Sequence, residues 1–207
     1  MFFIFMALNF GISWMNARGA GKVWSESKEI GGMLRVNAVI AYAMAIAGFT
    51  MVYTTILILL APYILPLFLE ISPEELWDVM QLTNDLLFVA IGTFIVPTGF
   101  YVWFISMVSF WKRRNLGDGL RLGWNTYAMI RNTAVFARHA PSAFGRISKA
   151  LFGGRGNRGK GGIALLAIFL IIIALLGGYL TASAIMKKAD EQYDLFDGYE
   201  IPNEANS

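Results

Sequence analysis

The stretch GGRGNRGKGG, residues 153–162, has the spacing of a phosphate-binding loop. Read from Gly154, it matches the pattern G-x-x-x-x-G-K-[ST] at every position except the last. In such a loop the final hydroxyl coordinates Mg²⁺, but here that position is Gly161. The loop must also follow a buried strand, whereas this stretch follows a basic amphipathic segment. We therefore predict no nucleotide site and expect a positively charged hinge that contacts lipid phosphate.

Few other residues are of a type that could carry out catalysis or bind a metal. The chain has no cysteine and a single histidine, His139, so we predict no metal site and no bound cofactor. The acidic residues between Glu70 and Asp85 lack the spacing of an EF-hand, and we expect them to form a solvated surface. No pair of residues suggests acid–base or nucleophilic catalysis, so we expect no catalytic residue and no enzyme activity.

The composition indicates a membrane protein. Of the 207 residues, 57% are hydrophobic and 15% are charged, whereas soluble domains have about 45–50% and about 25%. The apolar residues are concentrated in blocks at 2–15, 36–61, 86–111 and 163–186, and the last three blocks contain no charge. Each uncharged block has 24–26 residues, enough for a helix to cross a hydrocarbon layer of about 30 Å. The sequence thus predicts an all-α integral membrane domain with about four spans, of which the short first one is uncertain.

The charges predict an orientation. No lysine or arginine occurs between Arg35 and Lys112, whereas residues 16–35 carry four and residues 112–160 carry eleven. Because basic loops stay in the cytoplasm, we expect 16–35 and 112–162 inside and the acidic loop 62–85 outside. The tail 187–207 then lies outside, and the bacterial inner membrane is the expected location.

Two further helices are expected outside the spans. Ser72, Pro73 and Glu75 form a capping-box pattern that predicts a short amphipathic helix in the outer loop. Pro62 is expected to end the preceding helix near Ala61. Within the basic cytoplasmic segment, residues 142–152 predict an interfacial helix with a basic side.

Small residues recur at helical spacing in two of the spans, where they let helices approach closely. These faces predict helix packing, either within the chain or against another subunit. They comprise Ala41, Ala45 and Gly48 in one span and Ala174, Gly178 and Ala182 in another. The residues expected to contact lipid headgroups are Lys112, Arg113, Arg114, Arg146, Lys149, Arg155, Arg158 and Lys160.

These features favour a non-enzymatic structural or assembly subunit of a multi-protein membrane complex, of the secretion, conjugation, phage or energy-converting type. The expected partners are membrane lipids and other membrane subunits or further copies of the chain. The aromatic and acidic tail also suits docking to a neighbour. No nucleic-acid-binding motif is present, and topology explains the basic segment. The alternative is a small channel, pore or transporter.

Overall fold

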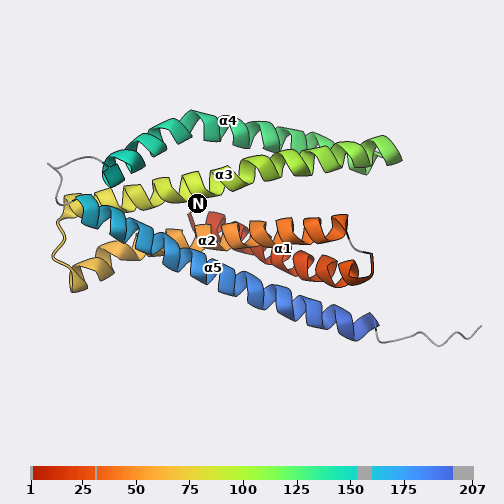
Figure 1. Ribbon diagram of the computed structural model, residues 1–207, viewed down its shortest axis with the longest axis horizontal. Coiled ribbons are helices and arrows are strands. Elements are labelled where there is room, and N and C mark those ends of the chain that lie inside the picture. Colours follow the sequence, from red (N-terminus) through yellow and green to blue (C-terminus); the bar gives the residue numbers. More distant parts are fainter. Residues whose placement is uncertain (1, 31, 153–159, 198–207) are drawn as a thin grey trace, which may run out of the picture. The chain divides into compact units, whose positions relative to one another are not determined.

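The computed structural model describes residues 2–30, 32–152 and 160–197, and five long helices account for nearly all of them (Figure 1). They are α1 (Phe2–Ile30), α2 (Met33–Phe68), α3 (Pro73–Arg113), α4 (Leu116–Phe152) and α5 (Lys160–Asp197). No strand occurs within these ranges. The all-α prediction is confirmed for the described residues.

Three helices are long and apolar enough to cross a membrane. They are the segments Arg35–Phe68, Pro73–Arg113 and Gly161–Gln192, which contain the three uncharged blocks of the sequence. Helix α1, which contains the predicted short span 2–15, does not meet the same criteria. Its role as a span stays a prediction.

The start of α3 follows the predicted capping box. The Glu75 backbone N–H donates to Ser72 Oγ at 3.2 Å, and the Ser72 backbone N–H donates to Glu75 Oε2 at 2.9 Å. Pro73 occupies the first turn, where its missing N–H costs nothing. The predicted short helix is therefore real, but it continues without a break into the apolar run 86–111.

The prediction that Pro62 ends its helix is wrong. Helix α2 continues through Pro62 and Pro66 to Phe68. An internal proline removes one backbone hydrogen bond and crowds the preceding turn. In an apolar environment, however, unwinding would expose several unpaired backbone groups, so a helix tolerates proline better there than it does in water.

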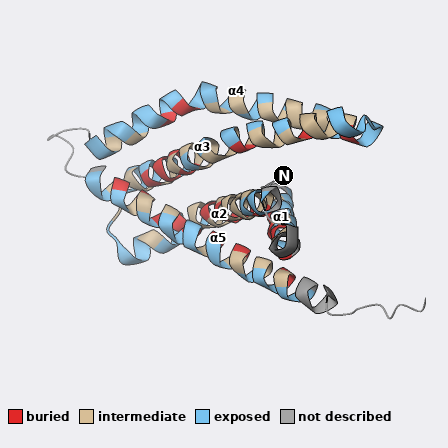
Figure 2. Cartoon of the chain, turned by 45° about the vertical axis from the view of Figure 1, so that its right-hand side comes forward, coloured by how far each residue is buried: buried red, intermediate tan, exposed pale blue. Residues whose placement is uncertain are grey.

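The chain forms two compact units. Unit 1 comprises residues 1–53 and 173–207, and unit 2 comprises residues 54–172. The core of unit 1 joins α1, α2 and α5 through buried Ala17, Ala45, Phe49 and Ala182. Figure 2 shows that most of the helical surface outside such cores is exposed or only partly buried.

The small residues of α5 pack against α2 within unit 1. Ala174 and Ala182 are fully buried. A Cβ atom added to Gly178 would lie 2.6 Å from Thr50 Oγ1 and 3.0 Å from the Ile46 carbonyl oxygen. On α2, Ala45 is fully buried, Ala41 is partly buried, and a Cβ on Gly48 would collide with Ser13 of α1. Both small-residue faces therefore serve packing inside the chain.

Unit 1 also brings together two segments that were expected on opposite sides of a membrane. A Cβ atom on Gly21 would lie 2.5 Å from the Met186 carbonyl oxygen and 2.8 Å from Ala189 Cβ. Residues 16–35 and the end of α5 are thus neighbours. The predicted placement of 16–35 inside and of the C-terminal tail outside is incompatible with this contact. The error came from treating the polar segment between α3 and α5 as one cytoplasmic loop.

Candidate functional site

Helix α4 lies along α3 in unit 2, and the two run in opposite directions (Figure 1). Near one end Asn125 Nδ2 donates to Ser106 Oγ at 2.6 Å. Farther along, the rings of Phe136 and Phe88 stack with centroids 5.7 Å apart. At the other end Arg146 is paired with Asp85.

This hairpin contradicts the predicted topology. Residues 62–85 and 112–162 were expected on opposite sides of a membrane, but Arg146 Nε lies 2.6 Å from Asp85 Oδ2. The first residues of α4 stay with the end of α3, where Arg113 pairs with Asp118 at 3.0 Å. A segment that follows the whole apolar length of α3 cannot lie on one side of a membrane that α3 crosses.

Met129 of α4 lies beside Gly99 of α3. Gly99 lies at the middle of the run 86–111, and a Cβ on it would be 3.9 Å from Met129 Cα. Arg131 follows two residues later, about 3 Å farther along the axis. Arg138 is nine residues from Met129, or about 14 Å, close to the edge of a hydrocarbon layer of about 30 Å. Arg131 therefore lies at the level of the most apolar part of α3.

Helix α3 leaves most of its apolar surface uncovered within the described residues. Only 6% of its most apolar 18-residue window is buried within the described structure. Phe100 and Phe104 are among the large side chains that remain exposed. Helix α4 covers only one side of α3 and leaves these rings uncovered. Because α4 lies along α3, it shares the depth of α3 in any membrane that α3 crosses.

The side of α4 that faces away from α3 has a distinct composition. Its residues recur at spacings of three, four and seven, so they share one face of the helix. We name this surface the α4 aromatic–basic face. It consists of Leu120, Trp124, Tyr127, Arg131 and Arg138. All five are exposed, and among the described residues neither arginine has an ion-pair or hydrogen-bond partner.

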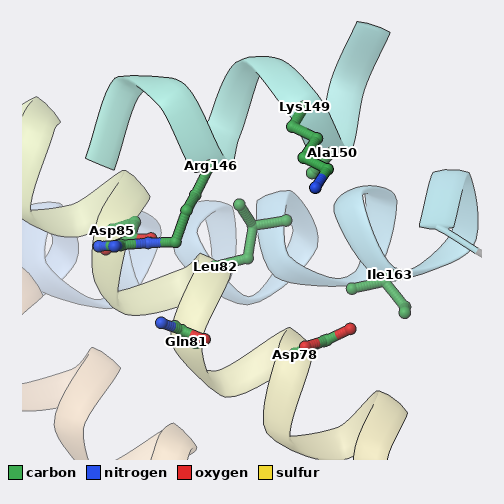
Figure 3. A pocket seen from close by; sticks show the side chains of 8 residues that line it. All are labelled: Asp78, Gln81, Leu82, Asp85, Arg146, Lys149, Ala150 and Ile163. Carbon is green, nitrogen blue, oxygen red and sulfur yellow. The ribbon is translucent and has the colours of Figure 1, made fainter. Parts of the chain in front are cut away.

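A charged pocket lies at the opposite end of the hairpin from the Arg113–Asp118 pair. Its volume is about 200 Å³, and α3, α4 and the first turn of α5 line it (Figure 3). The lining residues are Asp78, Gln81, Leu82, Asp85, Arg146, Lys149, Ala150 and Ile163. Beside it, Leu82, Ala164 and Ala167 form a buried apolar cluster that joins the same three helices.

The pocket contains one tight ion pair. Arg146 Nε and Nη2 donate to the two Asp85 oxygens at 2.6 and 2.7 Å, a bidentate arrangement. The Asp85 side chain is 7% exposed and that of Arg146 is 47% exposed. The hydrogen bonds to Asp85 raise the pKa of Arg146 above its ordinary value. The pair joins one positive and one negative group, and no hydrogen bond from Arg146 Nη1 occurs among the described residues.

The predicted lipid-contacting residues are divided between the two ends of the hairpin. Lys112, Arg113 and Arg114 end α3, and Arg114 also lies over the Trp111 ring at 5.9 Å. Arg146 and Lys149 lie at the pocket end. A single membrane surface therefore cannot hold the whole set.

The glycine-rich stretch is mostly outside the described residues, including Arg155 and Arg158. Lys160 is the first residue of α5. The segment preceding the stretch is helix α4, whereas a phosphate-binding loop follows a strand. Among the described residues, no group of three or more His, Cys, Asp or Glu side chains could hold a metal ion.

Comparisons with protein-family models, curated proteins and solved structures find no match to this chain.

Proposed function

We propose that this protein is a non-enzymatic subunit of a multi-protein membrane complex, and that the α4 aromatic–basic face is where a partner binds. The supporting observation is Arg131, which is exposed and unpaired among the described residues at the apolar middle of the α3–α4 hairpin. An arginine at the centre of a membrane-spanning helix costs about 2.5–3.5 kcal/mol or more unless it meets water or an acidic group.

The chain offers Arg131 little to pair with. Between residues 86 and 111, and between 163 and 186, no acidic residue occurs. The acidic residues of α4 and the adjacent part of α3, Asp118 and Asp85, already bind Arg113 and Arg146. We therefore place the matching carboxylate on a different protein that lies against α4 at this depth.

The rest of the face suits a protein interface. Trp124 and Tyr127 lie with their ring centroids 6.1 Å apart, and they are 69% and 58% exposed. Tryptophan, tyrosine and arginine are the residues that dominate binding energy at protein interfaces.

The proposal includes a topology in which α2, α3, α4 and α5 each cross the membrane. Residues 16–35 then lie on the same side as the end of α5, in agreement with the contact between Gly21 and Ala189. Residues 62–85 share the other side with the end of α4, in agreement with the Asp85–Arg146 pair. In this topology residues 16–35 and 112–114 carry seven basic residues on one side, against five in residues 146–160 on the other, and this excess favours the cytoplasm for the first side.

The size of the complex after extraction in mild detergent tests this proposal. The native protein should migrate as an assembly larger than a monomer and should carry at least one other protein. Arg131→Leu should release it as a monomer, and Arg131→Lys should retain most of the complex because the charge remains. Lys112→Leu, the same change at the end of α3, should leave the assembly intact. A monomeric native protein, or an unchanged complex with Arg131→Leu, would contradict the proposal.

A second candidate is a pore built from several copies of this chain, with Arg131 facing water. The same exposed arginine supports it, because a water-filled lumen also removes the cost of the charge. Purified protein in liposomes separates the two functions. Anion flux that Arg131→Leu abolishes would favour the pore, whereas the absence of flux together with a heteromeric native complex would favour the subunit.

A further inference from the structure

The charged pocket of unit 2 contains two opposite charges that the ion pair does not use. Asp85 and Arg146 neutralise each other, which leaves Asp78 on α3 and Lys149 on α4. Figure 3 shows Lys149 reaching down from α4 and Asp78 on α3 below it, with the ion pair to one side. Among the described residues, Asp78 and Lys149 each lack an ion-pair partner. The pocket thus offers one positive and one negative group in a space that Leu82, Ala150 and Ile163 also line.

The volume of the pocket suits a small charged group. About 200 Å³ corresponds to the space of about six or seven liquid water molecules. It is smaller than the roughly 300–1,000 Å³ of pockets that hold drug-sized ligands. A phosphate joined to an amine by a short linker is of the right size class, and its two charges match Lys149 and Asp78.

An apolar groove adjoins this pocket on the same unit. Its volume is about 460 Å³, and its lining is mainly apolar, with Val79, Ile163, Leu165, Leu166 and Phe169, although Glu70 and Glu75 also line it. Ile163 lines both the groove and the charged pocket. A ligand with a charged head and an apolar chain would therefore fill two adjacent sites that share a wall.

The charged pocket lies at the level along α3 and α5 where a membrane surface is expected. The uncharged run of α3 begins at Leu86, directly after Asp85, and the uncharged run of α5 begins at Ile163. The pocket lies where both apolar runs start. Phospholipid phosphates and amines occupy this level of a bilayer, next to the hydrocarbon core.

We propose that unit 2 binds one phospholipid with a zwitterionic, primary-amine headgroup of the phosphoethanolamine type. Lys149 and the unused Nη1 of Arg146 donate to the phosphate. The Asp78 carboxylate and the Gln81 amide oxygen accept hydrogen bonds from the ammonium group. A quaternary amine has no N–H and could not donate these hydrogen bonds. One acyl chain lies in the adjoining groove. This site needs the membrane location but not the partner at Arg131.

The test uses the purified full chain after lipid removal in detergent, with thermal unfolding and native mass spectrometry as readouts. Phosphatidylethanolamine should bind in a saturable manner and raise the melting temperature more than phosphatidylglycerol or phosphatidylcholine with the same chains. Phosphoethanolamine and inorganic phosphate, which lack acyl chains, should bind far more weakly. Strong binding of phosphate alone would identify a free-anion site and overturn the proposal.

Two variants and a control test the residues. Asp78→Asn should weaken phosphatidylethanolamine binding about tenfold, the effect of losing one charge-assisted hydrogen bond, and should remove the preference over phosphatidylglycerol. Lys149→Gln should weaken binding of all three phospholipids, and Arg121→Gln, an exposed residue near the other end of α4, should leave their binding unchanged. Equal binding of phosphatidylglycerol by the native protein, or an unchanged preference with Asp78→Asn, would overturn the proposal. Because no partner is present, failure here is distinct from failure of the complex.

Discussion

The Asp85–Arg146 pair provides a quantitative prediction about what holds α4 against α3. Replacing Arg146 by alanine leaves the Asp85 carboxylate, 7% exposed, without its two hydrogen bonds. Removing one partner of a fully buried pair costs about 3–5 kcal/mol, but the Arg146 side chain is 47% exposed. We therefore expect Arg146→Ala to lower the free energy of unfolding by about 2–3 kcal/mol, towards the range for hydrogen bonds to charged groups.

The reverse substitution should be milder. In Asp85→Ala the long Arg146 side chain can turn into solvent, so no buried charge is stranded. We expect a loss of about 1–2 kcal/mol, most of it from the hydrogen bonds and from the small cavity. In the double variant the losses should overlap, with a coupling energy of about 1–2 kcal/mol.

Unfolding of the purified protein by increasing fractions of sodium dodecyl sulfate, followed by tryptophan fluorescence, measures these differences. Lys149→Ala, one turn from Arg146 and without an ion-pair partner among the described residues, is the matched control. In lipid-free detergent it should change the free energy of unfolding by less than about 0.5 kcal/mol. Additive losses in the double variant, or a larger loss for Asp85→Ala than for Arg146→Ala, would refute the assigned contact.

Two further predictions concern glycines at close helix contacts. Gly178→Ala places a methyl group 2.6 Å from Thr50 Oγ1 and within 3.0 Å of the α2 backbone. It should therefore destabilise the protein by about 1–3 kcal/mol. A higher melting temperature would refute this packing. Gly92→Ala should also destabilise the protein, because its methyl group would meet the Phe136 ring. Gly123→Ala has nothing within 4 Å and should stabilise α4 by up to about 1 kcal/mol. The same detergent unfolding assay measures both variants, and equal effects would contradict the hairpin.

Local signals and uninterrupted apolar runs were readable from the sequence. The capping box at Ser72 depends on residues three positions apart, so local chemistry fixes it. The uncharged runs 36–61, 86–111 and 163–186 are long enough that only a helix can hold them in an apolar medium. These features predicted the helices, although not where each of them ends.

The hairpin was hidden because α4 contacts α3 through a mixture of polar and aromatic side chains. Asn125 and Phe136 contact α3. Ala140 and Ala143 are buried, whereas Trp124 and Tyr127 are exposed. A search for one apolar face therefore finds none in this segment. The spacing of small residues was an available signal, but the abundance of arginine pointed to a loop in water.

The charged pocket could not be predicted for a different reason. Asp85 and Arg146 are 61 residues apart, and neither lies in a local sequence motif that predicts a contact with the other. The topology assumed from charge placed them on opposite sides of a membrane. Only the pairing of α4 with α3 brings the two residues together. Because the predicted topology was wrong, the sequence analysis could not predict the pocket.

A disulfide between α3 and α4 tests most directly whether α4 returns along the apolar length of α3. The chain has no cysteine, so Gly99→Cys together with Met129→Cys introduces one defined pair. A Cβ on residue 99 lies 3.9 Å from the Met129 Cα, which is compatible with the geometry of a disulfide. We predict rapid, nearly complete cross-linking in native membranes, detected by a mobility shift that reductant reverses. Gly99→Cys with Tyr127→Cys, which points away from α3, should not cross-link, and failure of the 99–129 pair would contradict the account.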